Sequence, residues 1–531
     1  MKNMKLTRLS LLFAILIGTG LISAQKKNLK EPVFRSVTAD VNLVKGDMKT
    51  AWRECIGAGR ANEGLRADWQ EQLRKTKKDC GFKYIRMHGL LHDDMGVYFE
   101  DKAGNPIYNW QYIDQLYDFL LSIDVKPFVE LSFMPKALAS SDKTCFWWKG
   151  NVTPPKSHEK WYDFIKALTQ HFTERYGENE VKTWYFEVWN EPNLKYFFAG
   201  SMEDYFKLYD YTAKAVKSVS AAYRVGGPAT AGNGWIPEMI DYCQKSNCPI
   251  DFVSTHDYAV TKGLVDDNGF TQRFMIQNTK AITKNVIGSY NKIKKSTMPN
   301  LELHYTEWST SPSSEDNVHD AYHSAAFILD KLKGTEDYAN SMSYWVFTDI
   351  FEEMGPRATP FHGGFGLLNY QSIKKPAYFS YQFLNQLGNT ELQNKDTASW
   401  VCKSANGNIQ ALIWDFTLSR QGDSISNQKY YIRDLPSKEK GILKYQLANV
   451  AEGKYALKVT KVGYKSNDAY TTYLQMGRPA QLTKKQVQTI NEINSGAPFI
   501  NDIVEVKSDK KFSYQLPLNE NDVYFINLVK L

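Results

Sequence analysis

Two glutamates, Glu191 and Glu307, each stand at the end of a strand-like apolar run. Glu191 lies in the segment Trp-Asn-Glu-Pro-Asn at 189–193, and Glu307 lies in the segment His-Tyr-Thr-Glu-Trp-Ser at 304–309. Hydrolysis of a glycosidic bond needs one carboxyl group to protonate the leaving oxygen and a second to attack the anomeric carbon or activate water. A lone Asn-Glu-Pro tripeptide is also a turn or helix-cap signal, but two glutamates at equivalent strand ends are far more specific. We therefore predict a sugar-cleaving enzyme.

Parallel strands are the elements that would position these two carboxylates. Strand-like runs followed by amphipathic helical stretches recur through the first three quarters of the chain, which predicts an α/β fold, a (β/α)8 TIM barrel. Counted along the chain, Glu191 ends the fourth strand and Glu307 ends the seventh. All carboxyl ends of barrel strands open on one face, so the two glutamates would share one mouth. The expected strands lie near 55–57 and at 82–88, 126–133, 182–189, 223–227, 250–256, 301–306 and 341–347.

The periodicity changes after the barrel. Short alternating segments separated by polar turns, such as 409–414, 454–459 and 523–528, predict an accessory antiparallel β-sandwich. The polar stretch 483–494 is expected to form a helix within it, and 33–44 is a candidate edge strand of the same sandwich. The expected division is a signal peptide at 1–24, a catalytic barrel at 45–375 and a sandwich built from 25–44 and 376–531.

The first residues have the pattern of a secretory signal peptide. Lys2, Lys5 and Arg8 precede an apolar run at 9–21 and small residues up to Ala24, after which we expect cleavage and export to the periplasm or medium. The run is shorter than the ~20 residues of a membrane-spanning helix, and no later stretch is a candidate span. Removing 1–24 takes away three basic residues and no acidic one, which lowers the formal charge from +7 to +4. A surplus this small and dispersed does not favour nucleic acid as a partner.

Composition indicates a globular chain without a metal centre. The 531 residues are 43% apolar, enough for a barrel-sized core and a further domain. Six cysteines do not make a disulfide scaffold in a chain of this length. Cys243 and Cys248 are close enough to close a small loop, and the sequence leaves their pairing open. No Cys or His cluster has metal-ligand spacing, so we predict neither a catalytic metal nor a cofactor.

Six segments together resemble glycoside hydrolase family 39, the family of bacterial β-xylosidases and α-L-iduronidases. They are the two glutamate segments and residues 88–95, 128–135, 148–155 and 344–353, in the order that the family has them. The resemblance implies that Glu191 is the general acid/base and Glu307 the nucleophile of a retaining mechanism. Retention requires the two carboxyl groups about 5–5.5 Å apart, against about 6.5–9.5 Å for inversion. Sequence does not measure this distance.

Polar and aromatic residues at other strand ends are candidates for binding the sugar. His88 ends the second strand, where it is placed to donate to a sugar hydroxyl, and His256 and Tyr258 end the sixth, where the phenol would hold Glu307 ionised. By resemblance, Asn190 contacts the sugar 2-hydroxyl, although capping of the next turn is an alternative. Also by resemblance, Trp345 forms the floor of the sugar site, and Glu352 or Glu353 accepts hydrogen bonds from its hydroxyls; which of these two glutamates faces inward stays open.

The sequence favours xylose among the sugars. Asn193 and the loop at 149–155 look more like the bacterial xylosidase branch of the family than the iduronidase branch. An iduronate site would need cationic groups for the carboxylate, and none is conspicuous in the motif segments. The leading hypothesis is an exo-acting β-xylosidase that takes xylo-oligosaccharides. A related glycosidase for an α-L-iduronoside, arabinoside or β-glucoside, or a non-catalytic carbohydrate-binding protein, are the alternatives, and the sequence leaves exo or endo action and oligomeric state open.

Overall fold

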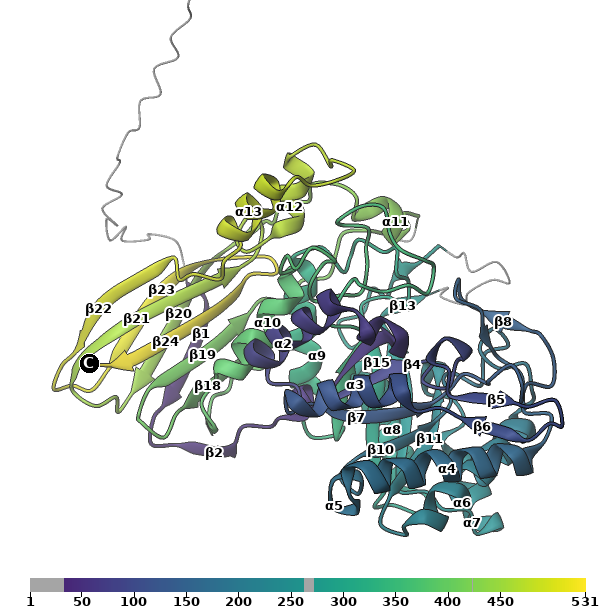
Figure 1. Cartoon of the computed structure of the whole chain (residues 1–531). Coiled ribbons are helices and arrows are strands. Elements are labelled where there is room, and N and C mark those ends of the chain that lie inside the picture. Colours follow the sequence, from purple (N-terminus) through teal and green to yellow (C-terminus); the bar gives the residue numbers. More distant parts are fainter. Residues whose placement is uncertain (1–32, 262–271, 423) are drawn as a thin grey trace, which may run out of the picture.

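The computed structural model describes residues 33–261, 272–422 and 424–531. A (β/α)8 barrel lies beside a β-sandwich whose strands come from both ends of the described chain (Figure 1). The expected signal peptide at 1–24 lies outside the described residues.

Eight parallel strands close the barrel, as the sequence predicts. Their neighbour order follows the chain order, and the closing pair joins the last strand to the first. Glu191 follows the fourth strand and Glu307 lies in the seventh, so the expected count is confirmed. The strands are β3 (Cys55–Arg60), β4 (Tyr84–His88), β7 (Lys126–Leu131), β10 (Tyr185–Val188), β11 (Arg224–Thr230), β12 (Phe252–Tyr258), β15 (Glu302–Ser309) and β16 (Ser341–Tyr344).

Helices cover the outside of the barrel. In α6, for example, Ser201 and Asp204 form a capping box at the first turn, and Tyr205, Leu208 and Thr212 then recur on the buried face. The helices of this layer are α1 (Ala51–Glu54), α2 (Ala67–Cys80), α3 (Gln111–Ser122), α4 (His158–Tyr176), α5 (Glu178–Val181), α6 (Met202–Val219), α7 (Ile236–Ser246), α8 (Thr283–Lys294), α9 (His323–Thr335) and α10 (Pro376–Gln386).

Short elements that the sequence analysis does not anticipate lie in the loops. Three are small antiparallel hairpins that follow the second, third and sixth barrel strands, on the face where the active site is expected. They are β5 (Tyr98–Glu100) with β6 (Pro106–Tyr108), β8 (Thr144–Cys145) with β9 (Gly150–Asn151), and β13 (Val260–Thr261) with β14 (Phe274–Met275). Short 3-10 helices are η1 (Ala61–Leu65), η2 (Asp93–Met95) and η3 (Ala231–Asn233).

Two sheets form the accessory sandwich. A seven-stranded sheet has the order β2-β17-β18-β19-β24-β21-β22 and a three-stranded sheet the order β1-β20-β23. Their facing side chains share one apolar core. The strands are β1 (Val33–Asp40), β2 (Val44–Asp47), β17 (Thr390–Leu392), β18 (Ser399–Lys403), β19 (Ile409–Trp414), β20 (Glu439–Ala448), β21 (Gly453–Val462), β22 (Ile500–Val506), β23 (Phe512–Asn519) and β24 (Val523–Lys530).

One strand pair departs from the expected antiparallel pattern. β1 is an edge strand of the sandwich, as expected, but it pairs parallel to β20. The whole barrel lies between β1 and β20 in the chain, and so long a connection does not impose the antiparallel pairing that a hairpin does. Helices α11 (Asn427–Tyr430), α12 (Ala469–Gln475) and α13 (Lys484–Ile493) complete this part, the last at the position that the sequence predicts.

The expected bounds of 45–375 for the barrel stay a prediction, and one element near each bound belongs to the other part. β2, at the start of that range, pairs with β17 in the seven-stranded sheet. α10, just past its end, packs against α9 and α2 in the helical layer. All six cysteines are described, and they are buried free thiols, Cys243 and Cys248 included. Across the described ranges, no helix is long and apolar enough to span a bilayer.

Candidate active site

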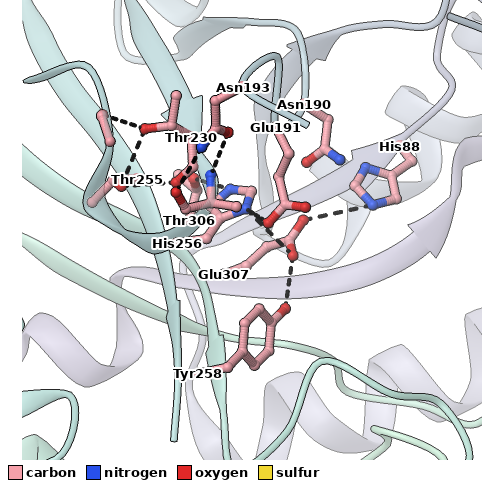
Figure 2. A network of polar contacts seen from close by, with 12 residues as sticks. His88, Asn190, Glu191, Asn193, Thr230, Thr255, His256, Tyr258, Thr306 and Glu307 are labelled. Carbon is pink, nitrogen blue, oxygen red and sulfur yellow. Dashed lines mark hydrogen bonds and ion pairs between the residues drawn. The ribbon is translucent and has the colours of Figure 1, made fainter. Parts of the chain in front are cut away.

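A cavity of about 330 Å³ opens at the carboxyl ends of the barrel strands. Polar side chains from several strands converge on it, and Figure 2 shows the central ones, with Glu191 and Glu307 facing each other. The residues that line it are His88, Asn190, Glu191, Asn193, Leu194, Phe197, Ala231, Gly232, Asp257, Tyr258, Val260, Glu307, Pro312, Trp345, Glu353 and Phe365. Both catalytic candidates and most of the expected sugar-binding residues therefore share one site.

The backbone after β10 holds Glu191 in an unusual conformation. Its φ of 45° is in the left-handed region, which non-glycine residues rarely occupy without support from their surroundings. Here the Glu191 N–H donates to the carbonyl of Ala229 (2.8 Å), and the Asn193 side chain both donates to and accepts from the backbone of Ala231 (2.9 Å each). Asn193 thus ties the loop after β10 to the loop after β11 and fixes the direction of Glu191.

Glu307 is held from both sides by hydrogen-bond donors. The Tyr258 hydroxyl donates to Oε2 (2.7 Å), as expected for this phenol, and Arg86 Nη1 donates to Oε1 (2.7 Å). One carboxylate oxygen of Glu307 lies within 4.8 Å of one of Glu191. So close an approach of two oxygens is compatible with the carboxyl separation of about 5–5.5 Å in retaining enzymes.

Arg86 is the centre of a buried charge cluster that the sequence analysis does not identify. The arginine is fully buried on β4, and besides Glu307 it pairs with Glu187 (2.5 Å) and Glu130 (2.9 Å). Its Nη2 also donates to Oδ1 of Asn190 (3.0 Å). With its oxygen engaged, Asn190 has its amide N–H groups left as donors in the cavity, which is compatible with the expected contact to a sugar hydroxyl.

The two glutamates differ in their proton affinity. Burial and the charge of Glu307 hold the pKa of Glu191 well above its usual range. Burial also raises the pKa of Glu307, but there Arg86, His88 and the Tyr258 hydroxyl oppose the rise. These opposing contacts make Glu191 the group of the pair that holds a proton more tightly, and they favour the carboxylate form of Glu307. This is the division that an acid and a nucleophile need.

His256 contacts the acid rather than the nucleophile. Its Nδ1 lies 2.9 Å from Glu191 Oε1, and its Nε2 lies 3.1 Å from the Thr306 hydroxyl. Burial, Arg86 and His88 hold the pKa of His256 well below its usual range, so the ring is neutral. Its Nδ1, Glu191 and Glu307 form the one acid and histidine group in the described ranges whose spacing also suits a metal ion, and these atoms belong to the carboxyl pair described above.

His88 and Trp345 form one wall of the cavity. His88 Nδ1 contacts Glu130 (2.8 Å), which leaves Nε2 directed at Glu307 and Glu353, 3.6 Å from each. The Trp345 ring packs beside His88 with centroids 4.6 Å apart. His88 Nε2 is therefore available to a ligand hydroxyl, as the sequence analysis expects.

The structure distinguishes Glu352 from Glu353. Glu353 lines the cavity, whereas Glu352 pairs with Arg60 (2.8 Å) and Arg66 (3.1 Å) and does not line it. The candidate sugar contact is therefore Glu353. The expectation that Glu352 binds the sugar is corrected, because Glu352 forms ion pairs outside the cavity. Burial and nearby carboxylates, Glu307 first among them, hold the pKa of Glu353 well above its usual range.

A signal for the missed residues is present in the strands themselves. Arg86, Glu130 and Glu187 are charged residues inside otherwise apolar barrel strands. Strands covered on both faces are normally apolar, so a charge there implies a buried partner. Sequence alone does not show that three such charges on three strands meet one another and Glu307.

A parallel barrel with paired carboxyl groups at its mouth is the arrangement that a glycoside hydrolase needs, and comparison with known proteins identifies this class. The sequence model of the glycosyl hydrolases family 39 matches residues 36–504. A β-xylosidase of Caldicellulosiruptor saccharolyticus is 41% identical over 458 residues, which cover 86% of this chain and 90% of that protein.

Solved structures are similar over nearly the whole length. The crystal structure of a family 39 enzyme from Xanthomonas axonopodis pv. citri has a TM-score of 0.90 at 38% identity, covering 94% of this chain and 98% of that one. A monomeric β-xylosidase from Caulobacter crescentus CB15 has a TM-score of 0.89 at 39% identity, with 94% and 100% covered. The chain belongs to glycosyl hydrolases family 39.

Proposed function

We propose that the protein is a retaining β-xylosidase that removes β-1,4-linked xylosyl residues from the ends of xylo-oligosaccharides. The observation that supports this most directly is the close spacing of Glu191 and Glu307, with the proton on one and cationic support on the other. Relatives named β-xylosidases that match nearly the whole chain support the choice of sugar.

The reaction proceeds in two displacements. Glu307 attacks the anomeric carbon while Glu191 protonates the departing oxygen, which leaves the xylosyl group bonded to Glu307. Glu191, now a carboxylate, takes a proton from water as the water oxygen attacks the anomeric carbon and releases Glu307. Asn190 donates to the 2-hydroxyl, an interaction that strengthens in the transition state. Each sugar leaves with the configuration it had in the substrate.

The wall of the cavity favours a neutral sugar over iduronate. No lysine or arginine is among the described residues that line it, and Arg86 behind the wall is already committed to Glu130, Glu187 and Glu307. An iduronate carboxylate would instead meet the carboxyl groups of the site, which costs free energy without a counter-charge. An iduronosidase is therefore disfavoured on the described residues.

The deciding experiment is hydrolysis of p-nitrophenyl β-xyloside, α-arabinoside, β-glucoside and an α-iduronide analogue, with the product anomer followed by NMR. We expect the β-xyloside to be hydrolysed best and to release β-xylose first. Turnover of another glycoside alone would overturn the sugar assignment, and release of the α-anomer would overturn retention. Binding without any turnover would favour the carbohydrate-binding alternative.

Variants of the two glutamates test their roles. Glu307→Ala should leave at most a few per cent of activity on every substrate, since it removes the carboxylate that forms the glycosyl bond. Glu191→Ala should lose about 10²–10⁴-fold in kcat/KM, which reports the first displacement, on substrates whose leaving group needs a proton. The loss in kcat/KM should be much smaller on a dinitrophenyl xyloside, whose leaving group does not need one. Equal losses on both substrates would argue against Glu191 as the acid.

Export and xylan breakdown are further parts of the proposal. The basic, apolar and small-residue regions at 1–24 support cleavage after Ala24 and a role outside the cytoplasm, where xylan fragments are met. N-terminal sequencing of the protein from a secreting host should find a chain that starts at Gln25. A chain that starts at Met1 and stays with the cytosol would contradict export.

A further inference from the structure

A line of hydrogen bonds crosses the barrel interior from Arg86 to Glu191. Arg86 Nε contacts Glu187 Oε2 (2.5 Å), and Thr306 Oγ1 contacts Glu187 Oε1 (2.8 Å). The line continues from Thr306 to His256 Nε2 and from His256 Nδ1 to Glu191 Oε1. Figure 2 shows the end of this line, with Thr306 and His256 beside the two catalytic glutamates. Every member is buried.

The direction of these bonds follows from the inventory of donors. The Glu187 carboxylate, paired with the Arg86 guanidinium, only accepts. A threonine hydroxyl carries one hydrogen, and here it points to Glu187, so the Thr306 oxygen has only lone pairs to offer His256. His256 must therefore carry its hydrogen on Nε2.

The other ring nitrogen is then an acceptor. A neutral imidazole with its hydrogen on Nε2 has a lone pair on Nδ1. Two carboxyl oxygens lie near it, Glu191 Oε1 at 2.9 Å and Glu307 Oε2 at 3.5 Å. Glu307 Oε2 already accepts from Tyr258, so the hydrogen between Nδ1 and the carboxyl pair has to come from Glu191.

We propose that Thr306, anchored on Glu187, is a positioning residue that holds His256 in the Nε2–H tautomer and so stores the catalytic proton on Glu191. The proposal rests on the proposed acid role of Glu191. The leaving oxygen of the substrate competes with Nδ1 for this proton in the first step. In the second step the Glu191 carboxylate faces a lone pair instead of a donor, which increases its affinity for the proton of the attacking water.

The groups around His256 agree with this arrangement. Arg86 and His88 on β4 oppose a positive charge on the His256 ring, and Glu191, after β10, meets the ring at Nδ1. On β15, Thr306 meets Nε2 and Glu307 lies near Nδ1. Tyr258 lies on the same strand as His256, and its hydroxyl donates to Glu307 and not to the His256 ring. Glu130 on β7 acts on Glu191, where its charge also favours the protonated form.

The test compares Thr306→Val, which keeps the shape of the side chain but removes the hydroxyl, with Thr306→Ser, which keeps the hydroxyl. In Thr306→Val the ring is free to place its hydrogen on Nδ1 and donate to the Glu191 carboxylate, which lowers the pKa of Glu191. In a plot of kcat/KM against pH, the fall on the basic side should then move to lower pH by about one unit. This is the shift in pKa expected from one hydrogen bond to a charged group. Thr306→Ser should keep the wild-type limb.

A merely structural role gives a different result. It would lower kcat in Thr306→Val with the basic limb unmoved, and that outcome overturns the proposal. The profile is measured on whichever aryl glycoside the wild-type enzyme hydrolyses best, so a wrong sugar assignment does not affect it.

A second readout needs no substrate. Nitrogen-15 NMR of histidine-labelled wild-type enzyme distinguishes a protonated from an unprotonated ring nitrogen, and the signals of His256, one of nine histidines, are assigned by their loss in His256→Asn. We expect a protonated Nε2 and an unprotonated Nδ1. A protonated Nδ1 would overturn the proposal even if Thr306→Val does not fold or the enzyme hydrolyses none of the glycosides.

Discussion

At the scale of single residues, neighbouring side chains with the same chemistry have different states because their surroundings differ. Glu352 and Glu353 are adjacent in the chain, yet one pairs with Arg60 and Arg66 and the other faces the catalytic carboxyl groups. The charge of Arg357 only partly offsets the effect of burial and of the nearby carboxylates on Glu353, and the His88 ring lies 3.6 Å from it. We infer that Glu353 enters the site as a protonated carboxyl, able to donate as well as accept.

The raised pKa of Glu353 makes a prediction for stability. Between the ordinary carboxyl pKa of about 4.3 and the raised value in the fold, the unfolded chain releases this proton and the folded chain keeps it. The free energy of unfolding contributed by the group therefore falls as pH rises through that window. Glu353→Gln has no proton to lose. The melting temperature of this variant minus that of the wild type should therefore increase as pH rises from 5 to 8.

Glu352→Gln is the matched control for this measurement. It removes ion pairs to Arg60 and Arg66 and should lower the melting temperature at both pH values. A difference between Glu353→Gln and wild type that does not change with pH would contradict the protonated state of Glu353.

Residue types near the strand ends are the part of the site that sequence predicts well. Glu191, Glu307, His256 and Tyr258 lie where a barrel mouth needs them, and counting strands is enough to bring them together. The charge cluster around Arg86 depends on which strand faces which across the barrel, and the tautomer of His256 depends on the Thr306 hydroxyl at its Nε2. Such contacts between distant segments are set by packing, and a single sequence does not contain their distances.

At the scale of elements, β3 is positioned by a glycine beneath the floor of the cavity. A Cβ at Gly57 would lie 2.5 Å from Cε3 of the Trp345 ring and 3.1 Å from the carbonyl oxygen of Tyr344. The indole is buried against His88 and Arg86, so it has little room to give way. The close approach of β3 to β16 therefore fixes where this ring lies in the site.

Gly57→Ala should consequently displace the Trp345 ring. We expect a loss of about 1–3 kcal/mol of stability from overpacking, together with a fall in kcat/KM if the ring forms the floor of the sugar site as proposed. Gly288→Ala is the control: it lies in α8 with nothing within 4 Å of the new Cβ, and it should be neutral or stabilising. Chemical denaturation and kinetics of both variants make the comparison, and unchanged kcat/KM in Gly57→Ala would argue against the ring as part of the site.

Elements with strong periodicity are predicted from the sequence, and those set by tertiary contacts are not. The barrel strands follow from apolar runs that end at polar residues, and the helix α13 from a polar stretch between alternating segments, because local pattern and final structure agree there. The small hairpins in the mouth loops are too short to have a period, and the long connection through the barrel leaves β1 free to pair parallel to β20. Their structure follows from the fold around them.

At the scale of the whole molecule, one apolar core runs from the barrel into the sandwich. Trp400, Trp414 and Phe525 of the seven-stranded sheet belong to the same buried cluster as the barrel helices. The Phe525 ring stacks on Phe383 of α10, with centroids 5.1 Å apart and planes 9° from parallel. A core this continuous couples the two parts, because neither can unfold without exposing apolar surface of the other.

We therefore predict that the sandwich and the barrel unfold together and that Phe525→Ala destabilises both. Truncating this ring should cost about 3–5 kcal/mol, and the thermal midpoints followed by tryptophan fluorescence, by far-UV circular dichroism and by residual activity should fall together. Ile503→Ala is the control, since Ile503 is 70% exposed on the same sandwich and its loss should change stability by no more than about 0.5 kcal/mol. A different outcome would be a lower circular dichroism midpoint in Phe525→Ala with the midpoint of residual activity unchanged from the wild type. The sandwich would then be an independent unit, and the barrel would not need it to keep the two glutamates in place.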